Sequence, residues 1–408
     1  MKPRPILTVV TALLMAAVVR SEEPALSDLQ ASQLQMQDVL SGIQSVLTQM
    51  QKTSVTGYVQ ARGVYQRSAV PSNNLFDKLA RLNLKNTSDY GSLMFSLDGG
   101  QNSVTVKDAY FDWYVLPNQG QRWTVRFGQF FRPFGYEIER SETQRELPER
   151  PAAWAILFPG NRDQGAYASL GLTRTLIFDL GILNGSGTST TALSYKDPDD
   201  DKDGIARLRW SCFTPRMDVA LSGYKGRQVV NGSAAVAAVT GFVDTNGNGK
   251  KDPGEATVIL TPAKTAVPTV RGDRDRWGAA LNFYDLLGGV FRGEYILARD
   301  LTTNLAPGLP LATADAAAGY ALYTHSVLPG TILGARYDFY DPDIHNTYRL
   351  GGDGEQETVG VVARQQVGDA ITFSLSWERQ RVRSFNVKSA VKTNQTNRPV
   401  TLQAQYVF

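Results

Sequence analysis

A twelve-residue segment in the middle of the chain has the spacing of a calcium-binding loop. Such a loop needs side-chain oxygens at positions 1, 3, 5, 9 and 12, a backbone carbonyl at position 7 and a glycine at position 6. The corresponding residues are Asp244, Asn246, Asn248, Lys250 (through its carbonyl oxygen), Asp252 and Glu255, with Gly249 at the turn. The spacing predicts bound Ca2+, although a solvated turn rich in Gly, Asn and Asp has the same composition.

A shorter acidic run repeats the beginning of this pattern. Asp199, Asp201 and Asp203 occupy the first three ligand positions and Gly204 the turn, but Trp210 stands where the final carboxylate is required. We therefore expect at most a weaker metal site there. The sequence indicates no other cofactor.

A second concentration of chemistry-bearing side chains lies between residues 132 and 163. Its basic members are Arg132, Arg140, Arg145, Arg150 and Arg162, and its acidic members are Glu137, Glu139, Glu142, Glu146, Glu149 and Asp163. Five basic residues thus face six acidic ones, and the segment contains no lysine. Opposite charges held at close range create a transverse field across a narrow passage, whereas a simple anion filter needs one sign in excess.

Catalysis is not indicated by the few nucleophile and base candidates in the chain. A hydrolase needs a serine or cysteine beside a histidine that a third group orients. Only His325, His345 and the single Cys212 are present, and Ser326 would face the opposite side of a strand from His325. We therefore expect no enzyme. The formal net charge of +3 is too small to indicate nucleic acid binding.

The N-terminal residues have the features of targeting and assembly segments. A basic start followed by a short apolar run over 6–19 predicts a secretory signal peptide over 1–21, with a short membrane anchor as the alternative. In 22–52, Leu29, Met36, Ile43 and Met50 recur every seven residues, which predicts a periplasmic coiled-coil helix that promotes oligomerisation. An amphipathic helix lying on its own domain or a disordered tether would also fit.

From residue 53 the apolar pattern changes to period two, which is typical of strands. We expect sixteen strands, at 54–66, 78–86, 91–98, 104–115, 122–132, 164–173, 175–183, 205–213, 217–227, 276–284, 290–299, 316–327, 331–340, 357–366, 370–380 and 399–408. An even number of strands of about ten residues, ending in an aromatic residue at Phe408, predicts an all-β, sixteen-stranded antiparallel transmembrane β-barrel over 53–408. A soluble β-sandwich is the alternative.

The connecting segments support the barrel because they alternate between short and long. Outer-membrane barrels have short periplasmic turns and longer external loops. Among the expected long loops are 133–163, which is the third external loop, 228–275 and 381–398. Both calcium-like motifs then lie outside the cell.

The lumen of such a barrel takes the polar side of each strand. The basic candidates are Arg62, Arg81, Lys85, Arg126, Arg132, Arg207, Arg209, Arg292, Arg336 and Arg364. The acidic candidates are Asp108, Asp112, Asp179, Asp218, Glu294, Asp338 and Glu378. The ten basic candidates slightly outnumber the seven acidic ones. Any one of these side chains could instead form an ion pair across strands and have only a structural role in the barrel wall.

One region resembles a known family. Residues 127–137 (FGQFFRPFGYE), followed by Glu149-Arg150-Pro151 and by 161–165 (NRDQG), are similar to motifs of the phosphate-selective porins of the O and P type, and Lys107-Asp108-Ala109-Tyr110 resembles the preceding strand of that family. The resemblance implies a homotrimer of sixteen-stranded barrels, an inward-folded third loop that narrows the pore, and selectivity for phosphate.

The sequence therefore predicts a bacterial outer-membrane porin that spans the lipid bilayer as a water-filled channel. We expect passive diffusion of small hydrophilic solutes with a weak, phosphate-like anion preference, constricted by loop 133–163. The alternative is a calcium-stabilised barrel that serves as a surface adhesion or structural protein.

Overall fold

The computed structural model describes most of the predicted barrel and a short part of what precedes it. The described residues are 36–42, 52–67, 73–100, 104–117, 122–185, 187, 201–212, 216–230, 239–243, 245, 249–251, 253, 256–261, 270–302, 312–347, 353–386 and 391–408. The chain divides into two compact units, residues 1–54 and 55–408.

In the N-terminal unit, residues 36–42 are helical and exposed to solvent. Met36, Val39 and Leu40 are each at least half exposed. The predicted signal peptide (1–21) and the rest of the predicted coiled coil (22–35 and 43–51) lie outside the described residues, so the coiled coil stays a prediction. No helix in the described part of the chain is long and apolar enough to cross a membrane.

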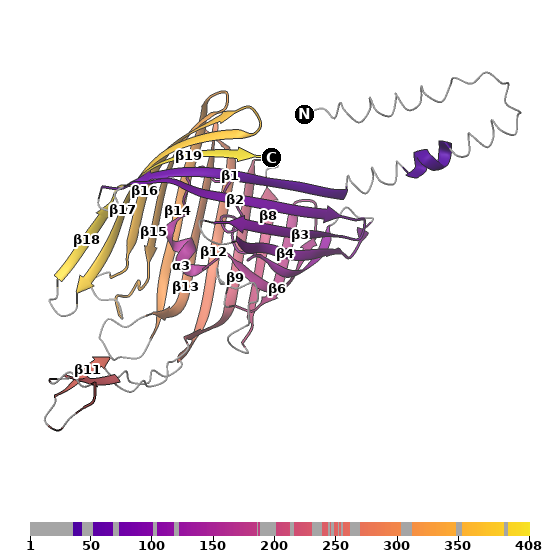
Figure 1. Ribbon diagram of the computed structural model, residues 1–408. Coiled ribbons are helices and arrows are strands. Elements are labelled where there is room, and N and C mark those ends of the chain that lie inside the picture. Colours follow the sequence, from indigo (N-terminus) through magenta and orange to yellow (C-terminus); the bar gives the residue numbers. More distant parts are fainter. Residues whose placement is uncertain are drawn as a thin grey trace, which may run out of the picture. The chain divides into compact units, whose positions relative to one another are not determined.

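In the described residues, sixteen strands close an antiparallel barrel, and β18 (Val391–Asn397) adds a further strand to the same sheet; this confirms the predicted barrel (Figure 1). The strands are β1 (Thr53–Tyr65), β2 (Asn73–Thr87), β3 (Gly91–Gly99), β4 (Val104–Tyr114), β5 (Trp123–Phe131), β6 (Arg162–Gly171), β7 (Leu176–Leu183), β8 (Asp203–Cys212), β9 (Met217–Val230), β12 (Val270–Leu286), β13 (Gly289–Thr302), β14 (Ala312–Leu328), β15 (Thr331–Asp341), β16 (Gln356–Val367), β17 (Ile371–Asn386) and β19 (Val400–Val407). Each strand pairs with the next in this order, and β19 pairs with β1 to close the ring.

The closure is tight at the end of β19. The backbone N–H of Gly57 donates to the carbonyl of Phe408 at 3.0 Å, and the N–H of Phe408 donates to the carbonyl of Gly57 at 3.0 Å. A Cβ atom at Gly57 would come within 2.6 Å of the Phe408 ring, so only glycine fits there.

Two predicted loops contain more strand than the sequence indicated. The prediction of a long loop over 381–398 is wrong, because β17 continues to Asn386 and pairs with β18 (Val391–Asn397). Within 228–275, β9 and β12 extend to Val230 and from Val270, and β10 (Val239–Phe242) pairs with β11 (Thr257–Thr261) as a separate hairpin. These parts project beyond the apolar band, where the period-two signal disappears because both faces are wet.

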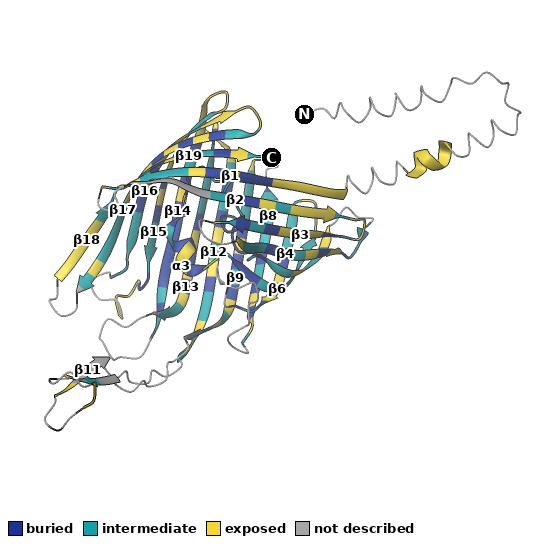
Figure 2. Ribbon diagram, in the orientation of Figure 1, coloured by how far each residue is buried: buried dark blue, intermediate teal, exposed yellow. Residues whose placement is uncertain are grey.

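The barrel wall has the opposite polarity to a soluble protein. Leu375 and Leu402 point outward and are 52% and 59% exposed, whereas the intervening Ser374, Ser376 and Gln403 are buried. The same alternation of buried and exposed positions runs along the strands in Figure 2. Only a hydrocarbon environment makes an apolar outer surface with a polar interior favourable.

Candidate functional site

The segment between β5 and β6, residues 132–161, turns into the barrel and is here called the interior loop. It contains a short helix, α3 (Ala152–Leu157), which lies against β15 (Figure 1). The segment coincides with the predicted third external loop over 133–163, except that β6 begins at Arg162.

Two buried ion pairs hold the ends of the interior loop. Arg132, at its start, donates to Asp163 at 2.9 Å, and both side chains are at most 2% exposed. Arg162, the first residue of β6 after the loop, donates to Asp108 on β4 at 2.8 Å. Both arginines were predicted to line the pore; their burial makes them anchors of the loop in the structure, because an unpaired buried charge is very costly.

A third anchor holds the first turn of the loop. Glu294 on β13 accepts the backbone N–H groups of Tyr136 and Glu137 at 2.6 and 2.5 Å. Gly135 has a φ of +57°, and a Cβ atom there would lie 2.5 Å from a carboxylate oxygen of Glu294. Glycine is therefore required for both backbone conformation and approach. The sequence marked Glu294 as a lumen acid but gave no signal for this role.

The middle of the loop reaches the wall formed by β1 and β2 and, separately, β8. Glu142 accepts a hydrogen bond from Arg81 on β2 at 2.7 Å and from the Tyr58 hydroxyl on β1 at 3.0 Å. Glu139 accepts from Arg207 on β8 at 2.7 Å. Because β8 is six strands from β2 in the ring, these contacts place the loop across the interior.

Further contacts connect the loop to β13, β15 and β16. Arg292 on β13 donates to Glu146 at 2.6 Å, and Arg336 on β15 donates to the carbonyl of Glu149 at 2.6 Å. Arg364 on β16 donates to the carbonyls of Arg145 and Thr143 at 3.2 and 3.1 Å. The loop is therefore fixed from several sides of the barrel.

The rest of the loop packs on a hydrophobic cluster inside the barrel. Phe134, Trp154 and Phe158 are completely buried. The Trp154 ring packs against Tyr320 on β14 with centroids 5.1 Å apart, and Phe158 packs against Tyr224 on β9 at 6.3 Å. Small inward residues on β14 leave room for these rings: Ala314, Ala316 and Ala318. Each buried aromatic stabilises the folded loop by about 1.5–3 kcal/mol.

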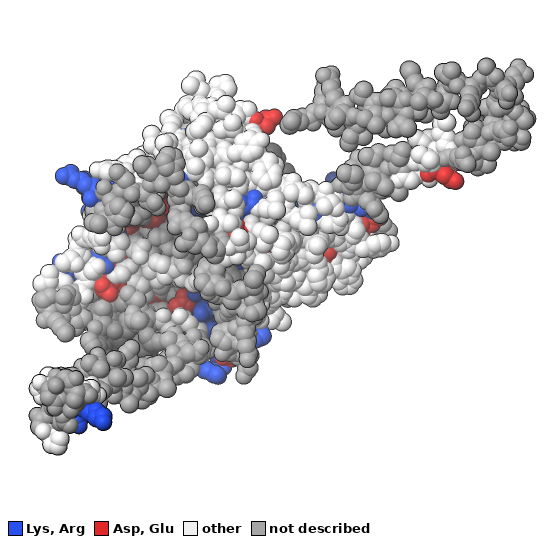
Figure 3. All heavy atoms as spheres, viewed as in Figure 1, with Lys and Arg blue, Asp and Glu red and all other residues white. Residues whose placement is uncertain are grey.

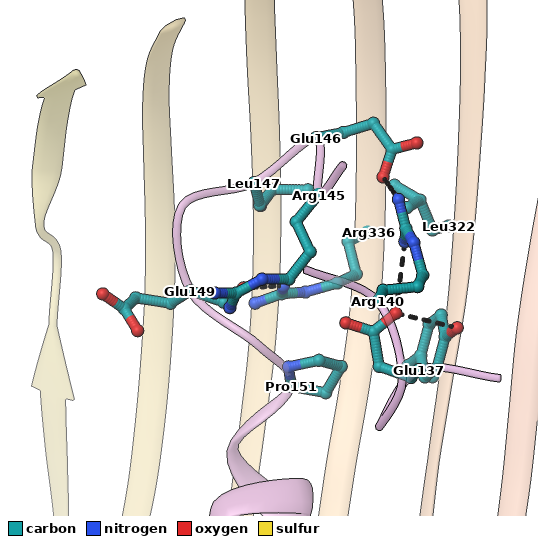
Figure 4. Close-up of a pocket in the computed structure, with 10 residues that line it drawn as sticks. Glu137, Arg140, Arg145, Glu146, Leu147, Glu149, Pro151, Leu322 and Arg336 are labelled. Carbon is teal, nitrogen blue, oxygen red and sulfur yellow. Dashed lines mark hydrogen bonds and ion pairs between the residues drawn. The ribbon is translucent and has the colours of Figure 1, made fainter. Parts of the chain in front are cut away.

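Charges within the loop neutralise one another. Arg140 lies between Glu137, at 3.1 Å, and Glu146, at 2.6 Å (Figure 4). The cavity that they line has a volume of only about 10 Å3, roughly one water molecule. In Figure 4, the Glu149 side chain points away from this cluster, and it is 60% exposed. It pairs with Arg62 on β1.

Electrostatics keep the loop carboxylates ionised. Burial alone would raise the pKa of Glu142, but Arg81 and Arg145 outweigh burial and hold the pKa well below its ordinary value. Burial would also raise the pKa of Glu146, but Arg140 and Arg292 outweigh burial and lower it. Burial, assisted by Arg145, lowers the pKa of Arg150 to about 10.

Most of the predicted lumen charges are paired across the wall. Arg126 contacts Asp112 at 2.6 Å, and Arg207 and Arg209 share Asp179 at 2.8 and 3.0 Å. The sequence reading missed Arg274 and Arg276, which contact Asp300 at 3.5 and 2.9 Å. Arg274 was omitted because β12 begins at Val270, six residues before the predicted strand, whereas Arg276 was the first residue of that predicted strand and was overlooked.

Another sector of the wall is lined mainly by uncharged polar side chains, although Arg62 on β1 and Glu378 on β17 share its inward face. Its uncharged inward side chains on β17, β19 and β1 are Thr372, Ser374, Ser376, Thr401, Gln403, Gln405 and Gln60. Gln60 donates to Gln405 at 2.7 Å, and Arg62 donates to Gln403 at 3.1 Å. Hydroxyls and amides both donate and accept, so this sector offers hydrogen bonds without selecting a charge.

The predicted metal ligands are only partly within the described residues. Asp244, Asn246, Asn248, Asp252, Glu255 and Asp199 lie outside them. Gly249 has a φ of +72°, and β10 and β11 flank the twelve-residue segment as a hairpin. No group of three or more His, Cys, Asp or Glu side chains in the described ranges is arranged to hold a metal ion.

The weaker motif is engaged by protein groups. The buried Asp203 carboxylate accepts the Tyr224 hydroxyl and, at 3.0 Å, the backbone N–H of Arg227. Asp201 contacts Arg227 at 3.3 Å. The two carboxylates therefore already have cationic or hydrogen-bonding partners.

A closed barrel with an apolar outer wall and an inward-turned loop defines the class of protein. The chain is a barrel of the bacterial outer membrane with the fold of the porins. The model of the phosphate-selective porin O and P family matches residues 78–196, which confirms the resemblance over β2 to β7 and the interior loop. No curated protein has a significantly similar sequence.

Three solved structures illustrate the shared fold. The outer membrane channel DcaP of Acinetobacter baumannii has a TM-score of 0.57 at 9% identity, covering 87% of this chain and 97% of that chain. The trimer form of OmpT, an outer membrane protein of Vibrio cholerae, has a TM-score of 0.55 at 11% identity, covering 87% and 99%. An anion-selective porin from Comamonas acidovorans has a TM-score of 0.52 at 9% identity, covering 87% and 99%.

Proposed function

We propose that the protein is a passive diffusion porin whose water-filled channel is constricted by the interior loop. The observation that carries the proposal is the loop's set of contacts with β2, β8 and β16, which supports a fixed constriction. The small cavity within the loop cluster has no room for a solute. Solutes then pass along the mainly uncharged polar sector of β17, β19 and β1, which suits small hydrophilic molecules.

We further propose a weak preference for anions, with phosphate among them. Paired arginines contribute little net field, so the preference must come from cations without a carboxylate of their own. Arg364 is such a residue: within the described part of the chain it donates to two carbonyls and forms no ion pair. Among the residues that the structure describes, the only carboxylate in contact with Arg145 is that of Glu142, at 3.5 Å, and Glu142 is shared with Arg81.

Reversal potentials across planar bilayers in a KCl gradient test this preference. We expect a mildly anion-selective value, which Arg364→Gln moves toward zero. Arg271→Gln is the matched control, since Arg271 is exposed near the outer edge of β12 and its loss changes net charge equally. A cation-selective native channel, or equal shifts for both variants, contradicts the assignment.

Two further expectations accompany the porin proposal. A homotrimer is supported by the trimer form of the structurally similar OmpT, and light scattering in detergent measures the oligomeric state.

Calcium binding in the β10–β11 hairpin is supported by the left-handed backbone of Gly249, which occupies the glycine position of the motif. The alternative of a surface adhesion protein is not favoured, because it gives the loop inside the barrel no role.

A further inference from the structure

The outward face of β17 changes from apolar to basic along one line. Phe373, Leu375 and Trp377 are exposed to the lipid side, and Arg379 follows them on the same face two residues later. Tryptophan is concentrated where the apolar band of a barrel meets the headgroups. Arg379 and the next outward residues, Arg381 and Arg383, therefore lie at headgroup depth, at the end of the barrel that carries the longer loops. The visible side wall in Figure 3 is mostly free of charged residues.

Acidic side chains neutralise Arg381 and Arg383 but, within the described part of the chain, not Arg379. Arg381 contacts Glu357 at 3.5 Å, and Arg383 pairs with Glu355. The residue opposite Arg379 on the side of β18 and β19 follows from the register, because Gln380 faces Asn397 and Trp377 faces Val400.

This register places Arg398 directly opposite Arg379 on the same outer face. Both residues are exposed, and among the described residues neither has an acidic partner. Like charges directly opposite each other in an antiparallel pair are destabilising.

Another sector of the same outer edge is built differently. Lys225 on β9 faces Asp275 on β12, Asp275 faces Arg299 on β13, and Arg299 faces Asp315 on β14. Signs alternate there across four strands, and Arg299 contacts Asp315 at 2.8 Å. The two like charges of Arg379 and Arg398 are therefore a local departure from the alternating charges along this edge.

We propose that Arg379 and Arg398 bind a phosphate group of a phosphorylated lipid in the outer leaflet. Opposite residues in an antiparallel pair are about 5 Å apart, which lets two guanidinium groups contact one phosphate through charge-assisted hydrogen bonds. The acyl chains lie below, on the apolar strip of Val361, Trp377 and Leu402.

The adjoining apolar strip distinguishes a lipid from free phosphate as the occupant. Inorganic phosphate makes no use of that strip, whereas a lipid satisfies both parts at once. A second copy of the chain is a poorer occupant, because it would bury two arginines whose charges no acidic neighbour compensates. The proposal depends on the outer-membrane location and not on channel activity.

Native mass spectrometry of the full-length protein in a non-ionic detergent tests the proposal. The probes are bisphosphorylated lipid A, the same lipid without its phosphates, and inorganic phosphate. We expect the native protein to retain the phosphorylated lipid at least about tenfold better than Arg379→Gln/Arg398→Gln, the loss expected for removing charge-assisted contacts. Lys225→Gln/Arg299→Gln removes the same charge from the alternating sector and should retain it fully.

Several outcomes overturn the proposal. These are equal retention by the native protein and the Arg379/Arg398 variant, equal retention of the dephosphorylated lipid, or displacement of the lipid by inorganic phosphate at comparable concentration. A change of oligomeric state in the variant would instead identify a protein interface. The single variant Arg398→Gln repeats the comparison if the double variant does not fold, as judged by heat-dependent gel mobility.

Discussion

Arg81 on β2 and Glu142 in the interior loop form an ion pair at 2.7 Å, although 61 positions separate them in the chain. Their side chains are 5% and 19% exposed. The pair joins the loop to a wall on which it has no covalent attachment. Loss of this contact should therefore change the current through the channel, even though the contact is far from both ends of the loop.

Glu142→Gln should release this part of the loop from the barrel wall and raise anion selectivity. The substitution leaves Arg81 with Asp98 alone and Arg145 without an acidic partner, and breaking a buried pair costs about 3 kcal/mol. Single-channel recording should show more frequent current fluctuations and a reversal potential shifted toward the anion value. Asp273→Asn, on the exposed outer edge of β12, is the charge-matched control. Identical traces for both variants would exclude the locking role.

Glu294→Ala should loosen the first turn of the loop. The backbone N–H groups of Tyr136 and Glu137 would lose their acceptor, at about 1–3 kcal/mol for each buried group left unsatisfied. Limited proteolysis should cut the loop faster in the variant. Glu294→Gln keeps an acceptor oxygen and should resemble the native protein.

Gly135→Ala tests the same turn by steric means. Its positive φ and its 2.5 Å approach to Glu294 predict increased cleavage, whereas Gly204→Ala, whose Cβ would come no closer than 3.8 Å to another residue, should have little effect. Native-like resistance of Gly135→Ala would contradict the assignment.

The loop carboxylates should hold their contacts well into acid. The pKa values of Glu142 and Glu146 are lowered in the folded state, so their stabilisation is complete above the ordinary value of about 4.3 and disappears only as pH falls through the lower, folded value. The difference in Tm between native protein and Glu142→Gln should stay constant from pH 7 to about pH 5. It should shrink only below about pH 4. A difference that disappears near pH 6 is incompatible with the ion pair.

Calcium should protect the segment 228–275 from proteolysis. Asp244→Ala removes the first ligand of the motif and should abolish the difference between calcium and chelator. Lys250→Ala is the matched control, because Lys250 would contribute only its backbone carbonyl, and it should remain protected. Equal cleavage of the native protein with calcium and with chelator would leave the motif as a solvated turn.

The barrel itself was predictable because the membrane imposes period-two alternation on every crossing segment. The outward Leu375 and Leu402 and the inward Ser374 and Gln403 follow that rule. The continuation of β17 to Asn386 did not follow it, since both strand faces are wet beyond the apolar band. A sequence pattern that depends on one apolar face cannot mark such strands.

The position of the interior loop was expected from the Pro-Phe-Gly motif, but its partners were not. Glu294, Arg292 and Arg364 are distant in sequence, and only the sheet register places them beside the loop. The apolar inner face of β14, with Ala316 and Ala318, contradicts the expected polar lumen. Besides that motif, the alanine-rich strand is a sequence signal that something packs inside the barrel.

Single-channel conductance can show directly whether the interior loop constricts the channel. The native protein is compared with a variant in which a short Gly-Ser linker replaces residues 139–149. We expect small discrete conductance steps from the native protein and clearly larger steps from the variant, because the replaced residues include Glu142, Arg145 and Glu149 of the proposed constriction. Equal step sizes, or lipid bilayers that stay silent with both proteins, would contradict a channel constricted by this loop.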